Sequence, residues 1–398
     1  MISTRAWSRD LSELTLAQAV AVRDSRLAEP VPTGAEGTWE LRTGSMIGVA
    51  FGEDWELRVV PKLDVPKLMF LLVYAVDTTG WQRSKALFEE ADDVITALAT
   101  GFAVLASSAL DRGLLRGYVW REDALPVVRG RIQFGTQIAR GGGLPLPVHL
   151  AYEDFTEDIL ENRLLRTATE LLLRLPRVPA DARRQLRRIR SILEQVEPLR
   201  EWRRVEAPKP TRLNASYMPA LRLAELILSS ASLSTSVGEI SSTTFVFDMN
   251  KVFEDFVTAA FRRAMRPYGG IVADQEKEHS LDVAGRLRLK PDLVWRVGSA
   301  PRAVLDAKYK EIDLGVMRHP DAYQMLAYCT AYGLPRGYLV YAKDSGAEPR
   351  MHMIRNSGHE IEVVTLDVEK EPEDLLSDVN ALAERVARRS TSPKALAA

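Results

Sequence analysis

The sequence predicts an α/β (α+β) protein with a β-rich and helical N-terminal region and a C-terminal mixed sheet flanked by helices. Short apolar runs rich in Val, Ile, Leu and Tyr, such as 46–51 and 338–341, are typical of strands. Longer segments whose apolar residues recur every three or four positions, such as 250–265, are typical of helices. The 398 residues, 46% of them hydrophobic, suffice for two or three domains.

Composition narrows the classes of function. The 53 basic and 54 acidic residues nearly cancel, so any nucleic-acid surface must be a local patch. Cys329 is the only cysteine, which excludes an intramolecular disulfide and fits a reducing compartment. The first residues lack a secretory core, and the longest apolar run, 68–76, is too short to span a bilayer. We therefore expect a cytoplasmic protein with no membrane contact.

Residues 1–155 are expected to form an N-terminal β-rich and helical domain. The runs 46–51 and 55–60, separated by a polar turn, predict a hairpin. Helical spacing follows over 67–75 and 85–110. Residues 113–132 again resemble strands, with a turn expected near Glu122-Asp123, and the Gly- and Pro-rich stretch 141–147 interrupts regular structure.

Residues 156–240 are expected to form a helical connector. Helices are predicted over 156–175, with Thr156 as its N-cap, over 180–195 and over 218–232. The outer face of the second helix carries a cluster of arginines, among them Arg183, Arg184, Arg187 and Arg188. These side chains either bind DNA phosphates or an acidic partner surface, or they form an ordinary solvated face, and the sequence does not favour a functional interpretation over the solvated face.

Residues 241–390 are expected to form a separate domain, followed by a flexible tail over 391–398. The expected order is a helix, a β-hairpin, a helix, three strands and a closing helix. Their predicted ranges are 250–265, 290–310, 321–332, 338–341, 351–354, 361–366 and 375–386. This order predicts a mixed sheet flanked by helices.

The candidate site lies on the predicted hairpin. Asp292 follows Pro291 at the head of one strand, and Asp306 and Lys308 lie at the end of the next. Fourteen positions separate the two aspartates, which fits one strand, a turn at Gly298 and the returning strand. Alternation places Asp306 and Lys308 on the same face. Charges in apolar strands are costly unless they are paired or bound to a metal, which favours a functional interpretation.

Two carboxylates and an ammonium are what a magnesium-dependent phosphodiesterase needs. Mg²⁺ prefers hard oxygen ligands and keeps several waters, so Asp292, Asp306 and the backbone carbonyl of Ala307 would suffice to hold it. Mn²⁺ is expected to substitute for it. Lys308 would orient the attacking water or neutralise the phosphate.

Three further side chains are accessory candidates. Gln324 and Tyr328 share one face of the next predicted helix at i, i+4 spacing, although each, taken alone, is more often an ordinary helix residue. Glu254, on the preceding helix, is either a further ligand or a solvated charge beside Asp255.

These motifs together resemble the McrC family, the nuclease subunit of McrBC-type modification-dependent (type IV) restriction systems. The matching C-terminal phrases are Phe247-Asp-Met-Asn-Lys-Val-Phe-Glu254, Lys290-Pro-Asp292, Leu305-Asp-Ala-Lys-Tyr-Lys310 and Asp321-Ala-Tyr-Gln-Met-Leu-Ala-Tyr328. The upstream phrases are Arg58-Val-Val-Pro-Lys62, Arg129-Gly-Arg131, Tyr152-Glu-Asp-Phe-Thr-Glu-Asp158 and Asn162-Arg163. The resemblance spans most of residues 40–345.

The resemblance implies a PD-(D/E)xK restriction-endonuclease-like domain with Asp292, Asp306 and Lys308 as its catalytic trio. It also implies cleavage of modified (methylated) double-stranded DNA, with a McrB-like, GTP-hydrolysing AAA+ ring that the N-terminal half docks into and stimulates. Cutting both strands would need two nuclease copies in the complex. This chain is not expected to bind nucleotide, because Gly130 and Gly135 have phosphate-loop spacing but Thr136-Gln137 replaces the required Lys-Ser/Thr.

Two other functions stay open on the sequence. The chain would be a non-cleaving adaptor that activates the AAA+ motor if its nuclease fold were structural only. A stand-alone RecB-like DNA repair exonuclease is suggested by Gln324 and Tyr328, but the large N-terminal half argues against it.

Overall fold

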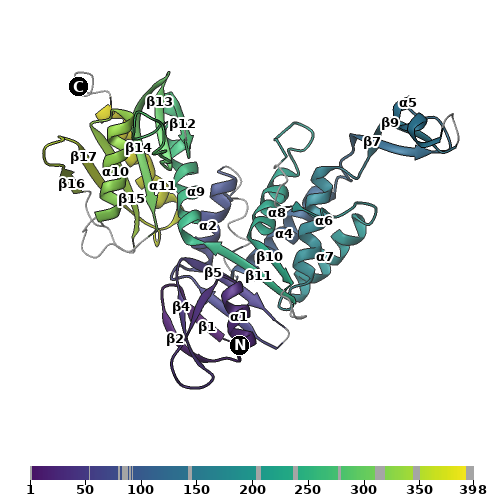
Figure 1. The fold of residues 1–398 in the computed structure, drawn as a ribbon, viewed down its shortest axis with the longest axis horizontal. Coiled ribbons are helices and arrows are strands. Elements are labelled where there is room, and N and C mark those ends of the chain that lie inside the picture. Colours follow the sequence, from purple (N-terminus) through teal and green to yellow (C-terminus); the bar gives the residue numbers. More distant parts are fainter. Residues whose placement is uncertain are drawn as a thin grey trace. The chain divides into compact units, whose positions relative to one another are not determined.

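The chain folds into two compact units in the computed structural model (Figure 1). The structure describes residues 2–52, 54–78, 81–82, 88, 91, 93–141, 146–202, 208–235, 241–276, 279–309, 319–343 and 350–390. One unit combines Met1–Ala97 with Ser230–Ala398, and the other is Leu98–Ser229. The first unit is therefore built from both ends of the chain.

A six-stranded mixed sheet forms the C-terminal part of the first unit. Its strand order is β12 (Ile271–Asp274), β13 (Leu293–Val297), β14 (Ala300–Lys308), β15 (Arg336–Lys343), β17 (Glu360–Asp367) and β16 (Arg350–Met353). β14, β15 and β17 run parallel to one another, whereas β12, β13 and β16 join by antiparallel pairing. The parallel strands are the apolar centre of the sheet and the antiparallel strands lie toward its edges.

Helices cover both faces of this sheet. α10 (His319–Tyr332) packs on the face that carries Val294, Val304 and Ile361. α9 (Met249–Ala264) and α11 (Pro372–Ser390) cover the other face, where Arg385 and Arg389 of α11 form ion pairs with the buried Glu362 of β17. Because strand side chains alternate between faces, the residues of β14 and β17 are divided between these two helical layers.

A five-stranded sheet joins the two ends of the chain in the same unit. Its order is β1 (Ile2–Arg5), β6 (Glu56–Val60), β5 (Met46–Phe51), β11 (Ser241–Asp248) and β10 (Ala231–Thr235). The approach of β11 to β5 requires Gly48, whose φ is +134° and whose hypothetical Cβ would lie 1.9 Å from the carbonyl oxygen of Phe245. β11 leads directly into α9 at Asp248, which caps that helix by accepting from the backbone N–H of Asn250.

Two smaller layers complete this unit. β2 (Arg9–Glu13), β4 (Thr38–Thr43) and β3 (Ala28–Pro32) form a three-stranded antiparallel sheet, and α1 (Leu16–Asp24) packs against β3. α2 (Val65–Val76) packs against α9, and the rings of Phe70 and Tyr74 lie 5.5 and 5.6 Å from that of Phe256. α9 is thereby held between α2 and the six-stranded sheet.

The second unit is a group of helices with a β-arm. Its helices are α4 (Val94–Leu110, which crosses the boundary between the units), α6 (Leu160–Leu173), α7 (Ala180–Ile192) and α8 (Met218–Ser230). The arm contains β7 (Gly117–Leu125), β9 (Val148–Thr156) and β8 (Arg131–Ile132), with α5 (Phe134–Gly141) at its far end (Figure 1). The small core of the arm is Val148, Leu150 and Tyr152.

The predicted mixed α/β fold class is confirmed, and most predicted elements are present within a few residues. The turn expected at Glu122-Asp123 is wrong, because both residues lie inside β7 and pair with Ala151 and Leu150 of β9. The Thr156 cap is also wrong. Thr156 ends β9, and the helix begins at Leu160 because Asp158 is instead buried in an ion pair with Arg163.

Some expectations fall outside the described residues. They include most of 83–92 in the helix expected over 85–110, part of the 141–147 break and the tail 391–398. The domain boundaries at 155 and 240 stay predictions. Within the described part of the chain, no helix combines the length and apolarity needed to cross a bilayer.

Candidate active site

The site is built on the β13–β14 hairpin. The two strands pair with Leu293 opposite Leu305, and a tight turn at Gly298 joins them. Continuing this register by one residue sets Asp292 opposite Asp306, which explains why two carboxylates fourteen positions apart meet at one end of the sheet. The predicted hairpin is thus present, with a register shift between Trp295 and Arg296.

Asp292 is held by its neighbour strand. The backbone N–H of Ala307 donates to Oδ2 of Asp292 over 2.8 Å. Burial and the nearby Asp306 carboxylate raise the pKa of Asp292 to about 7, although the Ala307 hydrogen bond opposes this shift. A carboxylate pushed toward neutrality by a second acid is common where a cation or a catalytic proton is handled.

Asp306 is almost fully buried, at 1% exposure, near the end of β14. Its Oδ2 lies 2.5 Å from Nζ of Lys308, two residues along the same strand face. Burial raises the pKa of Asp306, and the charge of Lys308 opposes that rise. Apart from this ion pair, neither carboxylate oxygen has a hydrogen bond of good geometry within the described residues. Such buried and under-satisfied oxygens are available to a ligand.

Lys308 carries the local positive charge. Burial disfavours its ammonium, but attraction from Asp306 and Asp292 outweighs this effect and raises the pKa of Lys308 above its ordinary value. The amine is therefore charged at neutral pH and is held beside both carboxylates. When both carboxylates are ionised, the single ammonium of Lys308 leaves the site with a net negative charge.

The residues present fit a hard divalent cation. Two close carboxylates, one of them with oxygens that accept no hydrogen bond of good geometry, match the oxygen ligands that Mg²⁺ takes while it keeps most of its waters. Within the described residues, no cluster of three or more His, Cys, Asp or Glu side chains forms a ready-made metal centre. Mg²⁺ bound there would draw its remaining ligands from a backbone carbonyl and water.

The two accessory candidates on α10 lie at this site. Nε2 of Gln324 donates to the Tyr328 hydroxyl over 2.7 Å, and that hydroxyl donates to the carbonyl of Lys290 over 3.0 Å. The bond to Lys290 ties α10 to the segment that leads into Asp292. Burial raises the pKa of Tyr328, and the charges of Asp306 and Asp292 add to this rise.

The third accessory candidate also lies near the site. Oε1 of Glu254 accepts from Nε2 of Gln275 over 2.8 Å, and the Glu254 charge contributes to the raised pKa of Asp292. Lys251, one turn earlier on α9, is close enough to Asp292 for the carboxylate to favour its charged form. The carboxylate of Glu254 and the ammonium of Lys251 thus lie at the edge of the site.

Asp321 is a neighbour of the site to which the sequence assigned no role. Its buried Oδ2 accepts from the Tyr341 hydroxyl over 2.7 Å, and its charge contributes to the raised pKa values of Asp306 and Lys308. An acid in the first turn of α10 looks like an ordinary helix-start residue. Its burial depends on the parallel strand β15, which local sequence does not reveal.

The arginines of α7 belong to the second unit. Arg183 donates to the carbonyls of Leu173, Leu175 and Pro176, so it satisfies groups at the end of α6. Arg184 forms an exposed ion pair with Asp181. Arg187 and Arg188 are exposed. Their suggested contact with DNA stays a prediction.

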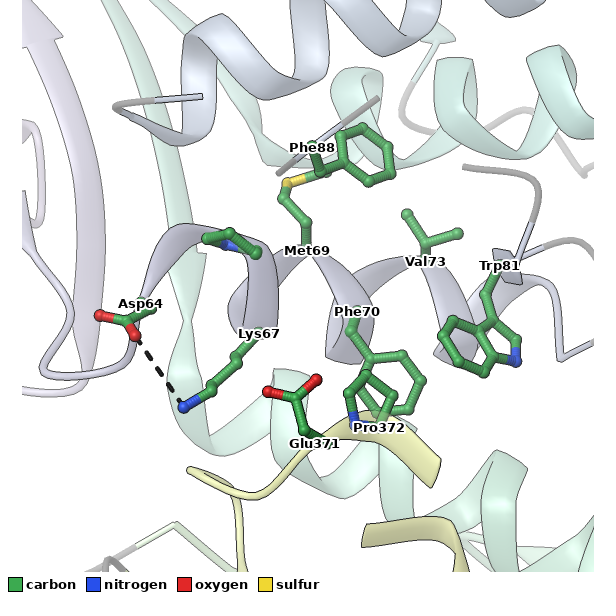
Figure 2. Close-up of a pocket in the computed structure, with 10 residues that line it drawn as sticks. Asp64, Lys67, Met69, Phe70, Val73, Trp81, Phe88, Glu371 and Pro372 are labelled. Carbon is green, nitrogen blue, oxygen red and sulfur yellow. Dashed lines mark ion pairs between the residues drawn. The ribbon is translucent and has the colours of Figure 1, made fainter. Parts of the chain in front are cut away.

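A separate pocket of about 330 Å³ lies between α2 and the start of α11 (Figure 2). Figure 2 shows an apolar wall that includes Phe70, Phe88 and Trp81, with Lys67 and Glu371 beside it. Lys67 forms ion pairs with Asp64 and Glu369. None of the residues that line this pocket belongs to the acidic site, so we assign it no part in catalysis.

The fold and the acidic site together define a mixed α/β protein whose central sheet carries two carboxylates and an amine at the ends of adjacent strands. Residues 41–342 match the profile of the McrBC family, described as the McrBC 5-methylcytosine restriction system component. The match covers well over half of the sequence, and the chain belongs to this family.

The chain shares its fold with a solved structure. A half-complex from a tetradecameric assembly of Thermococcus gammatolerans McrB AAA+ hexamers with bound McrC matches 96% of this chain and 100% of that chain, with TM-score 0.58 and 17% identity. A cryo-EM structure of the Thermococcus gammatolerans McrBC complex matches 66% of this chain and 88% of that chain, with TM-score 0.40 and 18% identity. Among curated proteins, none matches the sequence.

Proposed function

We propose that the chain is the DNA endonuclease subunit of a McrBC-like restriction system and hydrolyses phosphodiester bonds with Mg²⁺. The observation that carries this proposal is the meeting of Asp292, Asp306 and Lys308 at one end of the β13–β14 hairpin. Two acids with raised pKa values beside a charged amine contribute little to the stability of a protein core. They form a good site for a divalent cation and a phosphate.

The acidic residues would hold the metal. Asp292 and Asp306 supply carboxylate oxygens, and the backbone carbonyl of Ala307 supplies a third ligand. Mg²⁺, when bound, supplies positive charge that stabilises the phosphoryl group and makes a nearby water more acidic. Mn²⁺ would serve in its place.

Lys308 would act on the phosphate and the attacking water. Its ammonium, fixed by Asp306, offsets negative charge on the non-bridging oxygens as a water oxygen adds to phosphorus. The bond from phosphorus to the leaving DNA oxygen breaks, and that oxygen takes up a proton. Gln324 and Tyr328 would position the Asp292 segment, while Glu254 would act at the edge of the site.

Family membership supports the proposed partner and substrate. The family is described by 5-methylcytosine restriction, which supports modified double-stranded DNA as the substrate. The neighbouring structure contains McrB AAA+ hexamers with bound McrC, which supports an AAA+ ring as the partner. We propose that this ring hydrolyses GTP, that this chain stimulates the hydrolysis and that the ring activates cleavage. Double-strand cutting would bring two nuclease copies together in the complex. Nucleotide would bind to the ring and not to this chain.

Cleavage of methylated plasmid tests the proposal. Full-length chain with its AAA+ partner, GTP and Mg²⁺ is expected to linearise the plasmid. Asp306→Ala is expected to lower the rate at least about a hundredfold, because one metal ligand and the anchor of Lys308 are both lost. The matched control is Asp378→Asn, which removes only a surface ion pair with Lys370 and is expected to cut normally.

GTP hydrolysis by the partner separates this function from that of an adaptor. Asp306→Ala is expected to stimulate the GTPase as the wild type does while failing to cut. Undiminished plasmid cleavage by Asp306→Ala would overturn the nuclease assignment. Absence of cutting by the wild-type complex, with normal GTPase stimulation, would favour the non-cleaving adaptor.

A further inference from the structure

A small hairpin over residues 279–289, here named the 279–289 hairpin, leads directly into the catalytic segment. Ser280 pairs with Arg288, the N–H of Leu281 donates to the carbonyl of Leu287, and the N–H of Leu289 donates to the carbonyl of His279. Its turn is fixed by Asp282, whose Oδ1 accepts the backbone N–H groups of Arg286 and Leu287. The hairpin therefore has one defined conformation without help from a ligand.

The base of the hairpin is anchored to α10. The His279 ring stacks on the Tyr332 ring at 4.2 Å between centroids, and Leu289 packs against the core beneath α10. The carbonyl of Lys290 accepts from the Tyr328 hydroxyl. A rigid element whose end is fixed to the active-site helix can position a bound partner relative to Asp292 at little entropic cost.

Cations line the returning strand of the hairpin. Arg286, Arg288 and Lys290 are exposed at alternate positions, and none of them forms an ion pair with a carboxylate among the described residues. The acids nearby are already engaged: Glu276 pairs with Arg296, and Asp274 pairs with Arg262. One carboxylate oxygen of Asp282 accepts a backbone N–H of the turn. The hairpin with Lys290 thus carries three cations against the single carboxylate of Asp282, an excess of positive charge.

The spacing of these cations suits a DNA strand at the active site. An extended chain advances at most about 3.6 Å per residue, so Lys290 and Arg288 lie within about 7 and 14 Å of Asp292. Phosphates along one strand advance about 3.4 Å along the helix axis, so these cations can meet several phosphates beside the bond to be cut. The tip adds exposed apolar groups, Leu281, Val283 and Leu287, which fit the wall of a groove better than a phosphate.

We propose that the 279–289 hairpin, with Lys290, is a DNA-binding element that holds the backbone of double-stranded DNA next to Asp292 and Asp306. The inference rests on the proposed function for its choice of DNA as ligand. It adds a binding surface to that function and assigns the hairpin no chemical step.

Binding of a short mixed-sequence DNA duplex to the full-length chain tests this proposal, with Ca²⁺ replacing Mg²⁺ and fluorescence anisotropy read over a salt series. Arg286→Glu/Arg288→Glu is expected to weaken binding roughly tenfold or more and to reduce the slope of log K against log salt by about two. Arg286→Lys/Arg288→Lys is expected to retain the slope, because it keeps both charges and the fold.

The matched control reverses two exposed arginines at the opposite edge of the same sheet, Arg350 and Arg355. Arg350→Glu/Arg355→Glu is expected to bind DNA like the wild type. An unchanged affinity and slope for the hairpin variant, or an equal loss in the control, would overturn the inference. So would normal DNA binding together with lost self-association in sedimentation, because the hairpin would then be a protein contact.

The readout is independent of cleavage. A wild-type chain that never cuts but binds DNA through the hairpin would contradict the proposed function and support this inference. A chain that cuts normally while the hairpin variant binds and cuts as well as the wild type would contradict this inference alone.

Discussion

The buried Asp306 and the half-buried Asp292 are an electrostatic cost that the fold retains. Among the described residues, Asp306 is relieved chiefly by its ion pair with Lys308, and Asp292 accepts one backbone N–H. A protein selected for stability alone would replace such a pair by neutral side chains. The electrostatic cost of keeping the two carboxylates close together is explained if they share a bound cation.

The pKa of Asp292 gives a stability prediction. The pKa is raised from 3.8 to about 7 on folding, so the protonated carboxyl is favoured in the folded state. Its contribution to stability is fully present below about pH 4 and is lost as the pH rises through 7. Asp292→Asn keeps an acceptor for the Ala307 N–H and removes this loss.

We therefore expect Asp292→Asn in EDTA to melt at a higher temperature than the wild type at pH 8, with little difference near pH 4. Thermal unfolding of the full-length chain followed by circular dichroism measures this. An advantage of the same size at both pH values would show that charge on Asp292 is not its cause.

Helices and strands illustrate what the sequence reveals and what it does not. The hairpin and α10 were predictable because apolar periodicity and a single glycine turn are local signals. The course of β7 through Glu122-Asp123 was not, because its pairing with β9 comes from a segment about thirty positions away. The same limit applies to Asp321, whose burial needs β15.

The pairing of β5 with β11 gives a prediction at this scale. Gly48→Ala would place a methyl group against the carbonyl of Phe245 in a backbone conformation that L-residues rarely adopt. We expect it to lower the free energy of unfolding by roughly 2–4 kcal/mol, measured by urea denaturation.

Gly44→Ala is the matched control, because nothing lies within 4 Å of its hypothetical Cβ. It is expected to unfold within about 1 kcal/mol of the wild type. Equal unfolding midpoints for the two variants would contradict the close approach of β11 to β5.

At the scale of the whole molecule, the sequence of the second unit is inserted within the sequence of the first. Both ends of the sequence build the first unit, and residues 98–229 form the second. The sequence predicts domain boundaries at 155 and 240, whereas the pairing of β5 with β11 joins segments nearly two hundred positions apart. The candidate site was nonetheless accessible from the sequence, because all three proposed catalytic residues lie on one hairpin.

Exposed aromatic rings make the β-arm of the second unit a candidate contact for the AAA+ partner proposed above. Tyr118 and Phe155 form an exposed ring pair at 5.1 Å, and Trp120 is exposed beside them on the same face of β7. Exposed aromatic clusters of this kind commonly mark protein contacts.

Tyr118→Ser/Trp120→Ser is expected to reduce stimulation of the partner's GTPase about tenfold or more without lowering the melting temperature of the isolated chain. Leu213→Ser, at another highly exposed apolar position of this unit, is the control and is expected to stimulate normally. Full stimulation by the aromatic variant would exclude this face of the arm as the contact.

Calorimetric titration of the full-length chain with Mn²⁺ measures directly whether the acidic pair holds a cation. We predict one saturable site in the wild type that disappears in Asp292→Asn/Asp306→Asn, while Asp378→Asn binds as the wild type does. Undiminished binding by the double variant, or no binding by the wild type, would contradict the account.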